Sequence, residues 1–218
     1  MERIEELLKE KNRILYGLKS PDKLKREEAW KKVEYIVNTG NGDYLPLGYL
    51  RSLLWHRLQG VRDDAWSHLP LYKALLVKGI ERGLTAESDR IKWSAWSHVL
   101  DLINLGIVDK GKVIERRYSF WRLLRSRWVT IRKKSWRLLI DLVREGIILS
   151  KDKERYIEFL KNRKASVRIY AWEVSQDLQN LGFVTKEDLL SNIQFLQELT
   201  QKESSIKKRA MKVLKRLN

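Results

Sequence analysis

The chain has 218 residues, a formal net charge of +17 and no cysteine. The lack of cysteine excludes disulfide bonds and thiolate zinc sites, and no run of about 18 apolar residues is present that would span a membrane. The apolar fraction of 43% is that of a folded protein. The first residues lack the basic start and apolar core of a signal peptide, so we expect a cytoplasmic protein, one that could associate with the nucleoid. Abundant Lys, Arg and Glu fit a thermophilic source.

Amphipathic segments alternate along the chain and predict helices in pairs. The first helix of each pair, the outer helix, is expected near 3–18, 45–58, 111–126, 151–162 and 186–200. The second, the inner helix, is expected near 21–38, 61–78, 87–105, 129–145, 165–181 and 204–217. Ser20, Pro21 and Asp22 make a good start for the first inner helix, because an N-cap is followed by proline.

A five-residue motif recurs in the inner helices: a basic residue, two variable residues, Ala or Ser, and then Trp or Met. Its copies begin at Arg26, Arg62, Lys92, Arg132, Arg168 and Lys207. The large residues that end the copies are separated by intervals of 36, 30, 40, 36 and 39 residues. A period of this length predicts a solenoid of stacked helical pairs rather than a single globular core.

Glycine lies ten residues after four of the motif tryptophans, at Gly40, Gly106, Gly146 and Gly182. The residue just past a helix end often adopts a positive φ, which glycine accepts without steric cost. These glycines therefore predict where inner helices end.

One repeat, around 66–96, is irregular. Pro70 falls inside the inner helix expected over 61–78, and Gly79 follows Trp66 by thirteen residues rather than ten. Proline in a helix interior costs about 3 kcal/mol, so we expect a break or kink there. Either 70–82 serves as the missing outer helix, or that outer helix is lost.

The pattern Val61-Arg62-x-x-Ala65 and its copy Val167-Arg168-x-x-Ala171 resemble HEAT repeats. The resemblance covers nearly the whole chain. It implies an all-α fold, a right-handed α-solenoid of about six helical-hairpin repeats that forms one domain over 1–218. It says little about function, because such arrays serve many roles.

In typical HEAT repeats an aspartate in the turn between the helices pairs with the arginine, which forms a ladder through the stack. Asp22 and Asp89 can do so here, but the turns before Arg62, Arg132 and Arg168 hold no acidic residue. A cation in the first helical turn opposes the helix dipole, and the same place is a natural anion site. We therefore expect these three arginines to face an external polyanion. The alternative is that they bond turn carbonyls and stack on tryptophan inside the solenoid.

Positive charge is concentrated in the second half of the chain. Residues 112–137 hold ten basic residues and one acidic residue, Glu115, and further basic clusters lie at 161–168 and 202–216. Arginine predominates in the first cluster, which suits phosphate recognition. The predicted nucleic-acid-binding residues are Arg62, Arg116, Arg117, Arg125, Arg127, Arg132, Lys133, Lys134, Arg137, Arg163, Lys164, Arg168, Lys207 and Lys208.

Trp121 and Trp128 lie within the first basic cluster. They are candidates for stacking on unpaired bases. At helical spacing, aromatic residues also commonly belong to the core, so both interpretations stay open.

No phosphate-binding glycine loop, nucleophile elbow or zinc-protease motif is present. In size and charge the chain is distantly similar to the HEAT-like alkylpurine DNA glycosylases, but we find no Trp-x-x-x-Asp on an inner helix to match their catalytic pair.

The leading hypothesis is a non-catalytic protein without cofactors that binds nucleic acid, DNA more than RNA, through phosphates. The alternative is a scaffold for an acidic protein partner in a replication, repair or ribosomal complex, with a glycosylase third. We expect no membrane binding, because a basic amphipathic helix with an exposed apolar face is lacking.

Overall fold

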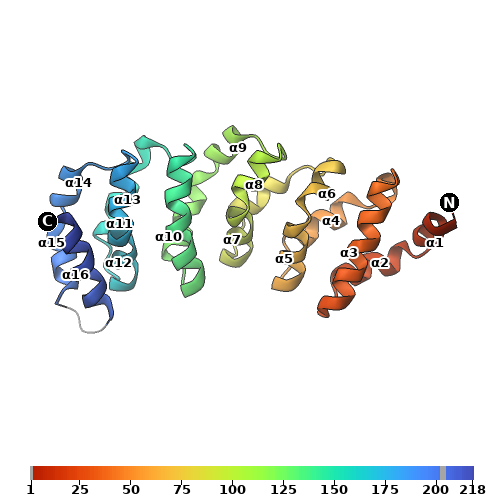
Figure 1. Ribbon diagram of the computed structural model, residues 1–218, viewed down its shortest axis with the longest axis horizontal. Coiled ribbons are helices and arrows are strands. Elements are labelled where there is room, and N and C mark those ends of the chain that lie inside the picture. Colours follow the sequence, from red (N-terminus) through yellow and green to blue (C-terminus); the bar gives the residue numbers. More distant parts are fainter. Residues whose placement is uncertain (1, 202–204) are drawn as a thin grey trace. The chain divides into compact units, whose positions relative to one another are not determined.

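The computed structural model describes residues 2–201 and 205–218, and every regular element in these ranges is a helix (Figure 1). No strand occurs among the described residues, and the helices pair into hairpins. The all-α solenoid class expected from the repeat period is therefore confirmed. Lys202, which belongs to the third basic cluster, lies outside the described residues.

The chain divides into two compact units, Met1–Arg116 and Arg117–Asn218, called unit 1 and unit 2 below. Each unit is a stack of hairpins with its own apolar core. The single domain expected over 1–218 stays a prediction.

In unit 1, a short outer element packs on the inner helix that follows it. The pairs are α2 (Lys11–Leu18) with α3 (Lys23–Asn38), α4 (Leu47–Leu53) with α5 (Gln59–Ser67), and η2 (Ile80–Thr85) with α7 (Asp89–Ser97). The inner helices α3, α5 and α7 pack on one another in that order. The unit also contains α1 (Glu2–Lys9), η1 (Gly42–Tyr44), α6 (Leu69–Ala74), α8 (Val99–Asn104) and α9 (Lys110–Glu115).

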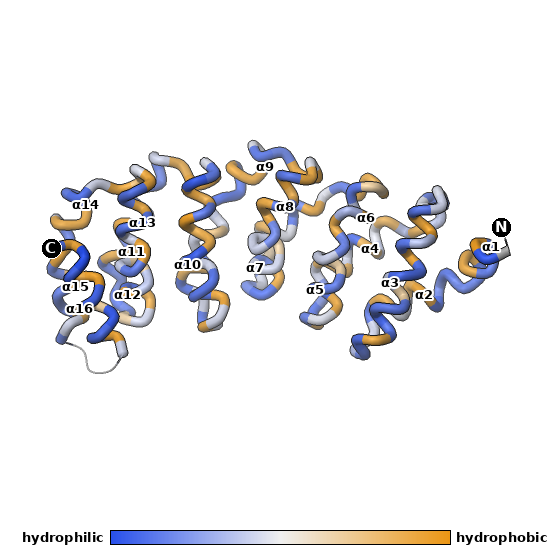
Figure 2. The backbone as a smooth tube through the Cα atoms, in the orientation of Figure 1, coloured by the Kyte–Doolittle hydropathy of each residue, from blue (hydrophilic) through white to orange (hydrophobic). Residues whose placement is uncertain are grey.

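Unit 2 repeats the arrangement. Its pairs are η3 (Arg117–Arg125) with α10 (Val129–Arg144), α11 (Lys153–Leu160) with α12 (Ala165–Glu173), and α15 (Ile193–Leu199) with α16 (Ser205–Leu217). Figure 2 shows hydrophilic and hydrophobic residues alternating along α10 and α16, as an amphipathic helix requires. The unit also contains η4 (Ser150–Asp152), α13 (Ser175–Asn180) and α14 (Lys186–Leu190).

Three of the outer helices expected from the sequence are divided. The segment 3–18 forms α1 and α2, the segment 111–126 forms α9 and the 3-10 helix η3, and the segment 186–200 forms α14 and α15. The amphipathic pattern correctly located these segments. It did not reveal their breaks, because only one or two residues separate the two parts of each segment and the apolar spacing continues nearly unchanged across them.

The motif tryptophans join the two helices of each hairpin. In four repeats the buried indole Nε1 donates to the carbonyl of a leucine twelve residues earlier, at 2.9–3.1 Å. The four pairs are Trp66 with Leu54, Trp96 with Leu84, Trp136 with Leu124, and Trp172 with Leu160. The bond satisfies an indole that would otherwise be buried unpaired.

The first repeat departs from this pattern. The Nε1 atom of Trp30 is buried and has no hydrogen-bond partner among the described residues. Its ring instead stacks on His68 of the next repeat, with centroids 4.2 Å apart and an interplanar angle of 7°. His98 stacks on Trp66 in the same way at 5.1 Å. The two histidines of the repeated Trp-Ser-His sequence therefore join successive layers.

The predicted glycine positions do adopt positive φ: 79° at Gly40, 71° at Gly106, 72° at Gly146 and 75° at Gly182. In the irregular repeat the residue ten places after Trp66 is Leu76, and it takes the same conformation, with φ of 56°. Its hydrogen bonds match those at the glycines as well. The backbone N–H of Leu76 donates to the carbonyl of Lys73, and the N–H of Val77 donates to the carbonyl of Tyr72. The helix end is therefore regular even where glycine is missing.

The break expected at Pro70 is present, but its cause differs. The inner helix divides at His68 into α5 and α6, yet the same division occurs without proline at His98 and at Val174. In the first two cases the histidine ring lies against the carbonyl four residues earlier, Asp64 or Ser94, and competes for it. Pro70 lies in the first turn of α6, where it is tolerated. Neither alternative for the outer helix holds, because the short η2 takes that place.

Candidate nucleic-acid interface

In the four repeats whose motif begins with arginine, the arginine turns inward and donates to carbonyls of the turn before its helix. In Arg26, Nη1 donates to the carbonyls of Ser20 and Pro21, and Nε donates to the carboxylate of Asp64 at 2.6 Å. The expected partner, Asp22, instead caps α3 by accepting from the backbone of Leu24. The ladder therefore exists, but its acid comes from the next repeat.

Arg62 repeats this geometry and is only 3% exposed. Its Nη1 donates to the carbonyls of His56 and Arg57, and its Nε donates to Ser94 Oγ at 2.9 Å. Burial lowers the pKa of Arg62 from its ordinary value, but the guanidinium stays charged. The prediction that Arg62 faces an external polyanion is wrong, because turn carbonyls and a serine already satisfy a buried group.

Arg168 is also buried, so the prediction that it faces an external polyanion is wrong too. Its Nε donates to the carbonyl of Asn162 at 2.7 Å, and its Nη1 donates to the carboxylate of Glu198 at 2.8 Å. The acid that the sequence did not place near Arg168 is supplied by α15, thirty residues later. Arg168 is therefore part of the stack rather than of an exposed track.

Arg132 is intermediate between these cases. Its Nη1 donates to the Ser126 carbonyl at 2.9 Å, and its guanidinium lies 6.0 Å from the ring centroid of Tyr170. Its Nε is buried without a hydrogen-bond partner. Tyr170 occupies the motif position that Asp64 and Ser94 occupy in unit 1, so a ring replaces the acceptor.

Arg116 and Arg117 are engaged as well. Arg116 donates to the carbonyl of Lys112 at 2.9 Å and lies 3.8 Å from Glu115. Arg117 donates to both carboxylate oxygens of Asp152, at 2.7 and 3.2 Å. That bidentate pair is largely buried and holds η3 to η4, so we assign Arg117 to the fold rather than to a surface.

The remaining predicted cations of unit 2 are exposed. Their side chains form no hydrogen bond or ion pair within the described part of the chain, although the guanidinium of Arg127 lies over the ring of Trp128 at 5.0 Å. They lie at the end of η3, in the turns before α10 and α12, in the first half or middle of α10, and near the start of α16. They are Arg127, Lys133, Lys134, Arg137, Lys164, Lys207 and Lys208, together with Arg125 and Arg163, which line a groove.

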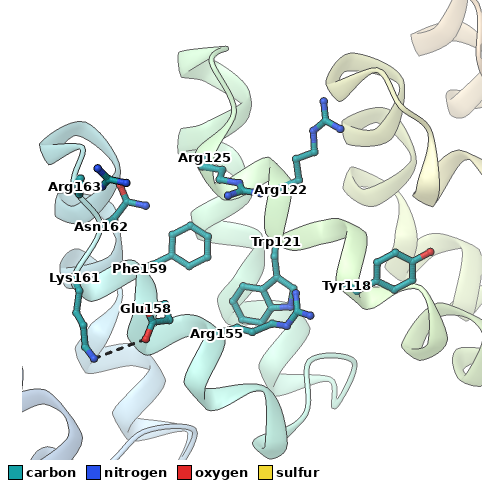
Figure 3. Close-up of a pocket in the computed structure, with 10 residues that line it drawn as sticks. All are labelled: Tyr118, Trp121, Arg122, Arg125, Arg155, Glu158, Phe159, Lys161, Asn162 and Arg163. Atoms are coloured by element: carbon teal, nitrogen blue, oxygen red, sulfur yellow. Dashed lines mark ion pairs between the residues drawn. The ribbon is translucent and has the colours of Figure 1, made fainter.

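The groove lies between η3 and α11 and has a volume of about 470 Å³. Figure 3 shows Trp121 and Phe159 near its centre, with Tyr118 on one side and Lys161 and Glu158 on the other. Its remaining lining residues are Arg122, Arg125, Arg155, Asn162 and Arg163. Five cations and one carboxylate therefore surround three aromatic rings.

Neither of the two tryptophans that were candidates for base stacking is fully exposed. Trp121 is 5% exposed and stacks on Phe159 with centroids 6.1 Å apart, so it offers no open ring face. Trp128 is half-buried as the N-cap residue of α10. Tyr118, at 58% exposed, presents the most accessible ring of the groove.

Sequence reasoning missed Arg155 and Phe159 as site residues. Arg155 follows Glu154 and precedes Glu158, so its local charge is balanced along the chain. Phe159 looks like one more core residue of an amphipathic helix. A signal was available in the pairing of outer helices, because residues near 120 and 157 occupy equivalent places in adjacent repeats.

Three further features of the described residues concern metal ligands, membrane-spanning helices and tyrosines with a shifted pKa. Among residues 2–201 and 205–218, no group of three His, Asp or Glu side chains is placed to hold a metal ion. No described helix is both long and apolar enough to cross a membrane. Burial raises the pKa of Tyr72 and Tyr156, whose hydroxyls donate to the carbonyls of Leu50 and Ala171 within the core.

The fold and the groove define an α-helical repeat protein with a cationic groove. No protein-family model matches the chain, and no curated protein matches it significantly. Similar solved structures include an engineered protein from the Northeast Structural Genomics Consortium, with 20% identity over 100% of this chain and 97% of that one and a TM-score of 0.45. A designed armadillo repeat protein in complex with the peptide (KR)4 has 14% identity over 94% and 98% and a TM-score of 0.47. A second engineered protein of the consortium has 19% identity over 94% and 57% and a TM-score of 0.44.

Proposed function

We propose that the chain is a non-catalytic, HEAT-like repeat protein that binds nucleic acid through phosphate contacts on unit 2, with DNA as the first candidate. Phosphate contacts carry no base information, so binding is largely independent of sequence. The observation that carries the proposal is the set of exposed, unpaired cations in unit 2.

The charge balance of unit 2 supports this proposal. Residues 117–218 hold 24 of the 45 basic residues and 11 of the 28 acidic residues, a net charge of +13. Six of those acids are already held in ion pairs: Asp141, Asp152, Glu158, Glu173, Asp188 and Glu198. Few carboxylates are left to neutralise the exposed cations, which suits an external polyanion.

The HEAT-like part of the proposal rests on the inward arginines. The arginine of the inner helix bonds the preceding turn and reaches an acceptor in the next repeat, as with Arg26 and Asp64. A ladder of this kind is what the resemblance implies, although the acid is displaced from the turn to the following helix.

The test is fluorescence anisotropy with three labelled ligands: a duplex of about 20–30 base pairs, a single strand of the same length, and a structured RNA. We expect binding at low salt. If about six phosphates are neutralised, log K falls against log salt with a slope of about −5. Negligible binding to all three ligands would contradict the proposal.

Two variants, one in each unit, test whether the binding surface lies on unit 2. Replacing Lys133, Lys134, Lys207 and Lys208 by glutamine removes four exposed cations of unit 2, and we expect the slope to become shallower by about 0.9 for each phosphate that is no longer neutralised. Lys31→Gln with Lys78→Gln removes exposed cations of unit 1 and should leave the slope unchanged.

A pull-down from nuclease-treated lysate tests the scaffold alternative. A scaffold keeps its acidic protein partner after the nuclease treatment, whereas a nucleic-acid binder loses its ligand.

A further inference from the structure

We infer that the groove between η3 and α11 receives an unpaired nucleotide of single-stranded nucleic acid. This inference rests on the proposed function and names the form of ligand that one part of the surface takes. It goes beyond phosphate contacts, because it assigns the base a place as well.

The cations of the groove are available to a phosphate. Arg125, Arg155 and Arg163 are exposed, and their side chains have no hydrogen bond or ion pair among the described residues. Lys161 lies 3.8 Å from Glu158, but their side chains are 39% and 73% exposed, so solvent weakens that pair. Guanidinium groups bind phosphate oxygens in pairs and stack on planar rings, and four arginines, these three among them, line the groove.

One ring of the groove, that of Tyr118, is exposed and available to a base. Trp121 and Phe159 stack at an interplanar angle of 17° and form a fixed floor, whereas the exposed ring of Tyr118 lies at the side. Stacking of a base on an aromatic side chain contributes about 1–3 kcal/mol and requires a base face that is free. A duplex hides those faces within its own stack, so the groove favours an unpaired base over a paired one.

The amide of Asn162 adds a fixed polar group to the groove wall. Its Oδ1 accepts from the backbone of Lys164 at 2.9 Å, which orients the side chain, and its Nδ2 has no acceptor among the described residues. The volume of about 470 Å³ is within the range of small-ligand sites and accommodates one nucleotide.

An acidic phosphopeptide would use the same cations, but it gives the rings no partner. The rings and the cations together therefore favour a nucleotide. The difference between the two ligands is the base, and the test is built on it.

Two probes of equal charge isolate the base: a strand of about 12 thymidines, and a strand of the same length in which abasic sites replace the thymidines. We expect the intact protein to bind the thymidine strand about 5- to 100-fold more tightly, as measured by anisotropy. Tyr118→Ala should abolish most of that difference, whereas Tyr118→Phe should keep it because the ring is retained. Tyr44→Ala, which removes an equally exposed tyrosine from unit 1, should have no effect.

A second variant pair tests the charges. Arg125→Gln with Arg155→Gln should weaken both strands by a similar factor, because phosphates are common to both. Equal affinity for the two strands in the intact protein, or a Tyr118→Ala variant that retains the difference, overturns the inference. An acidic phosphoserine peptide that binds as tightly as the thymidine strand and is insensitive to Tyr118→Ala overturns it too.

The outcome for the proposed function is read separately. If duplex, thymidine strand and structured RNA all fail to bind at low salt, both proposals fail together. If the duplex binds with a steep salt dependence while the thymidine and abasic strands do not differ, only the assignment of the groove fails.

Discussion

Burial decides what each arginine of this chain does. Arg163 and Arg168 lie five residues apart in one turn and its helix, yet Arg163 is exposed in the groove and Arg168 is buried in the stack. A buried guanidinium must satisfy several N–H donors, and the carbonyls of the turn supply them. The inward position is therefore fixed by the fold, and only the outward one is free to serve a ligand.

At the residue scale, leucine is an unfavourable residue for the backbone conformation at position 76. Its φ of 56° is in the left-handed region that glycine takes at the equivalent place in four other repeats. Its side chain is 75% exposed, so replacing it removes little packing. We expect Leu76→Gly to raise the free energy of unfolding by about 1 kcal/mol, because glycine lacks the steric penalty of an L residue there.

The measurement is the urea midpoint, with Leu76→Ala as the matched control. Alanine removes the exposed side chain but retains Cβ, so it should change the free energy of unfolding by no more than about 0.5 kcal/mol. If alanine stabilises as much as glycine, the exposed leucine rather than its φ is the cause.

At the scale of elements, the sequence predicted the inner helices well. The motif, the tryptophan and the glycine ten residues later each reflect a physical need of the hairpin: a fastened turn, a filled interface and a left-handed end. The breaks were harder to foresee. Two of the three inner-helix breaks arise where His68 and His98 compete for carbonyls of their own helix, and a periodicity of apolar residues does not reflect that competition. The third, at Val174, has no such histidine.

The candidate site was predicted only in part, and for a related reason. Exposed cations close together in sequence, such as Lys133 and Lys134, are visible as a cluster. The groove instead combines η3 with α11, whose facing residues are more than thirty positions apart. Arg155 joins it although acidic neighbours mask its charge in the sequence. Such a site becomes apparent only when equivalent positions of adjacent repeats are laid side by side.

The ladder between α3 and α5 allows a test drawn from the chain itself. Arg26 donates to Asp64, and Arg62 donates to Ser94 at the equivalent position of the next repeat. A serine hydroxyl is therefore an adequate acceptor for a buried guanidinium in this fold. We expect Asp64→Ala to cost about 2–3 kcal/mol of unfolding free energy, because the buried charge is left without its partner, and Asp64→Ser to cost about 1 kcal/mol.

Urea unfolding of the two variants checks this expectation, and Asp63→Ala, an exposed neighbour, should be nearly neutral. Equal costs for alanine and serine would show that the hydrogen bond to Arg26 contributes nothing specific.

At the scale of the whole molecule, charge is distributed unevenly between the units. Unit 1 holds 21 basic and 17 acidic residues, a net charge of +4, against +13 for unit 2. Unpaired cations repel one another and destabilise the compact state that carries them. A function that needs a polyanion explains why such a surface persists at a cost in stability.

That cost predicts how the free protein responds to salt. Raising the ionic strength from about 0.01 to about 0.15 M shortens the Debye length from about 30 to about 8 Å and screens repulsion among exposed cations. We expect Tm to rise by about 3–6 °C, which corresponds to about 1–2 kcal/mol for a chain of this size. The variant with Lys133, Lys134, Lys207 and Lys208 replaced by glutamine should have a higher Tm at low salt and a smaller response, while Lys31→Gln with Lys78→Gln should behave like the parent protein. A Tm that is insensitive to salt in all three proteins would mean that the cations do not repel one another, and the charge of unit 2 would then give no reason to expect a polyanionic ligand.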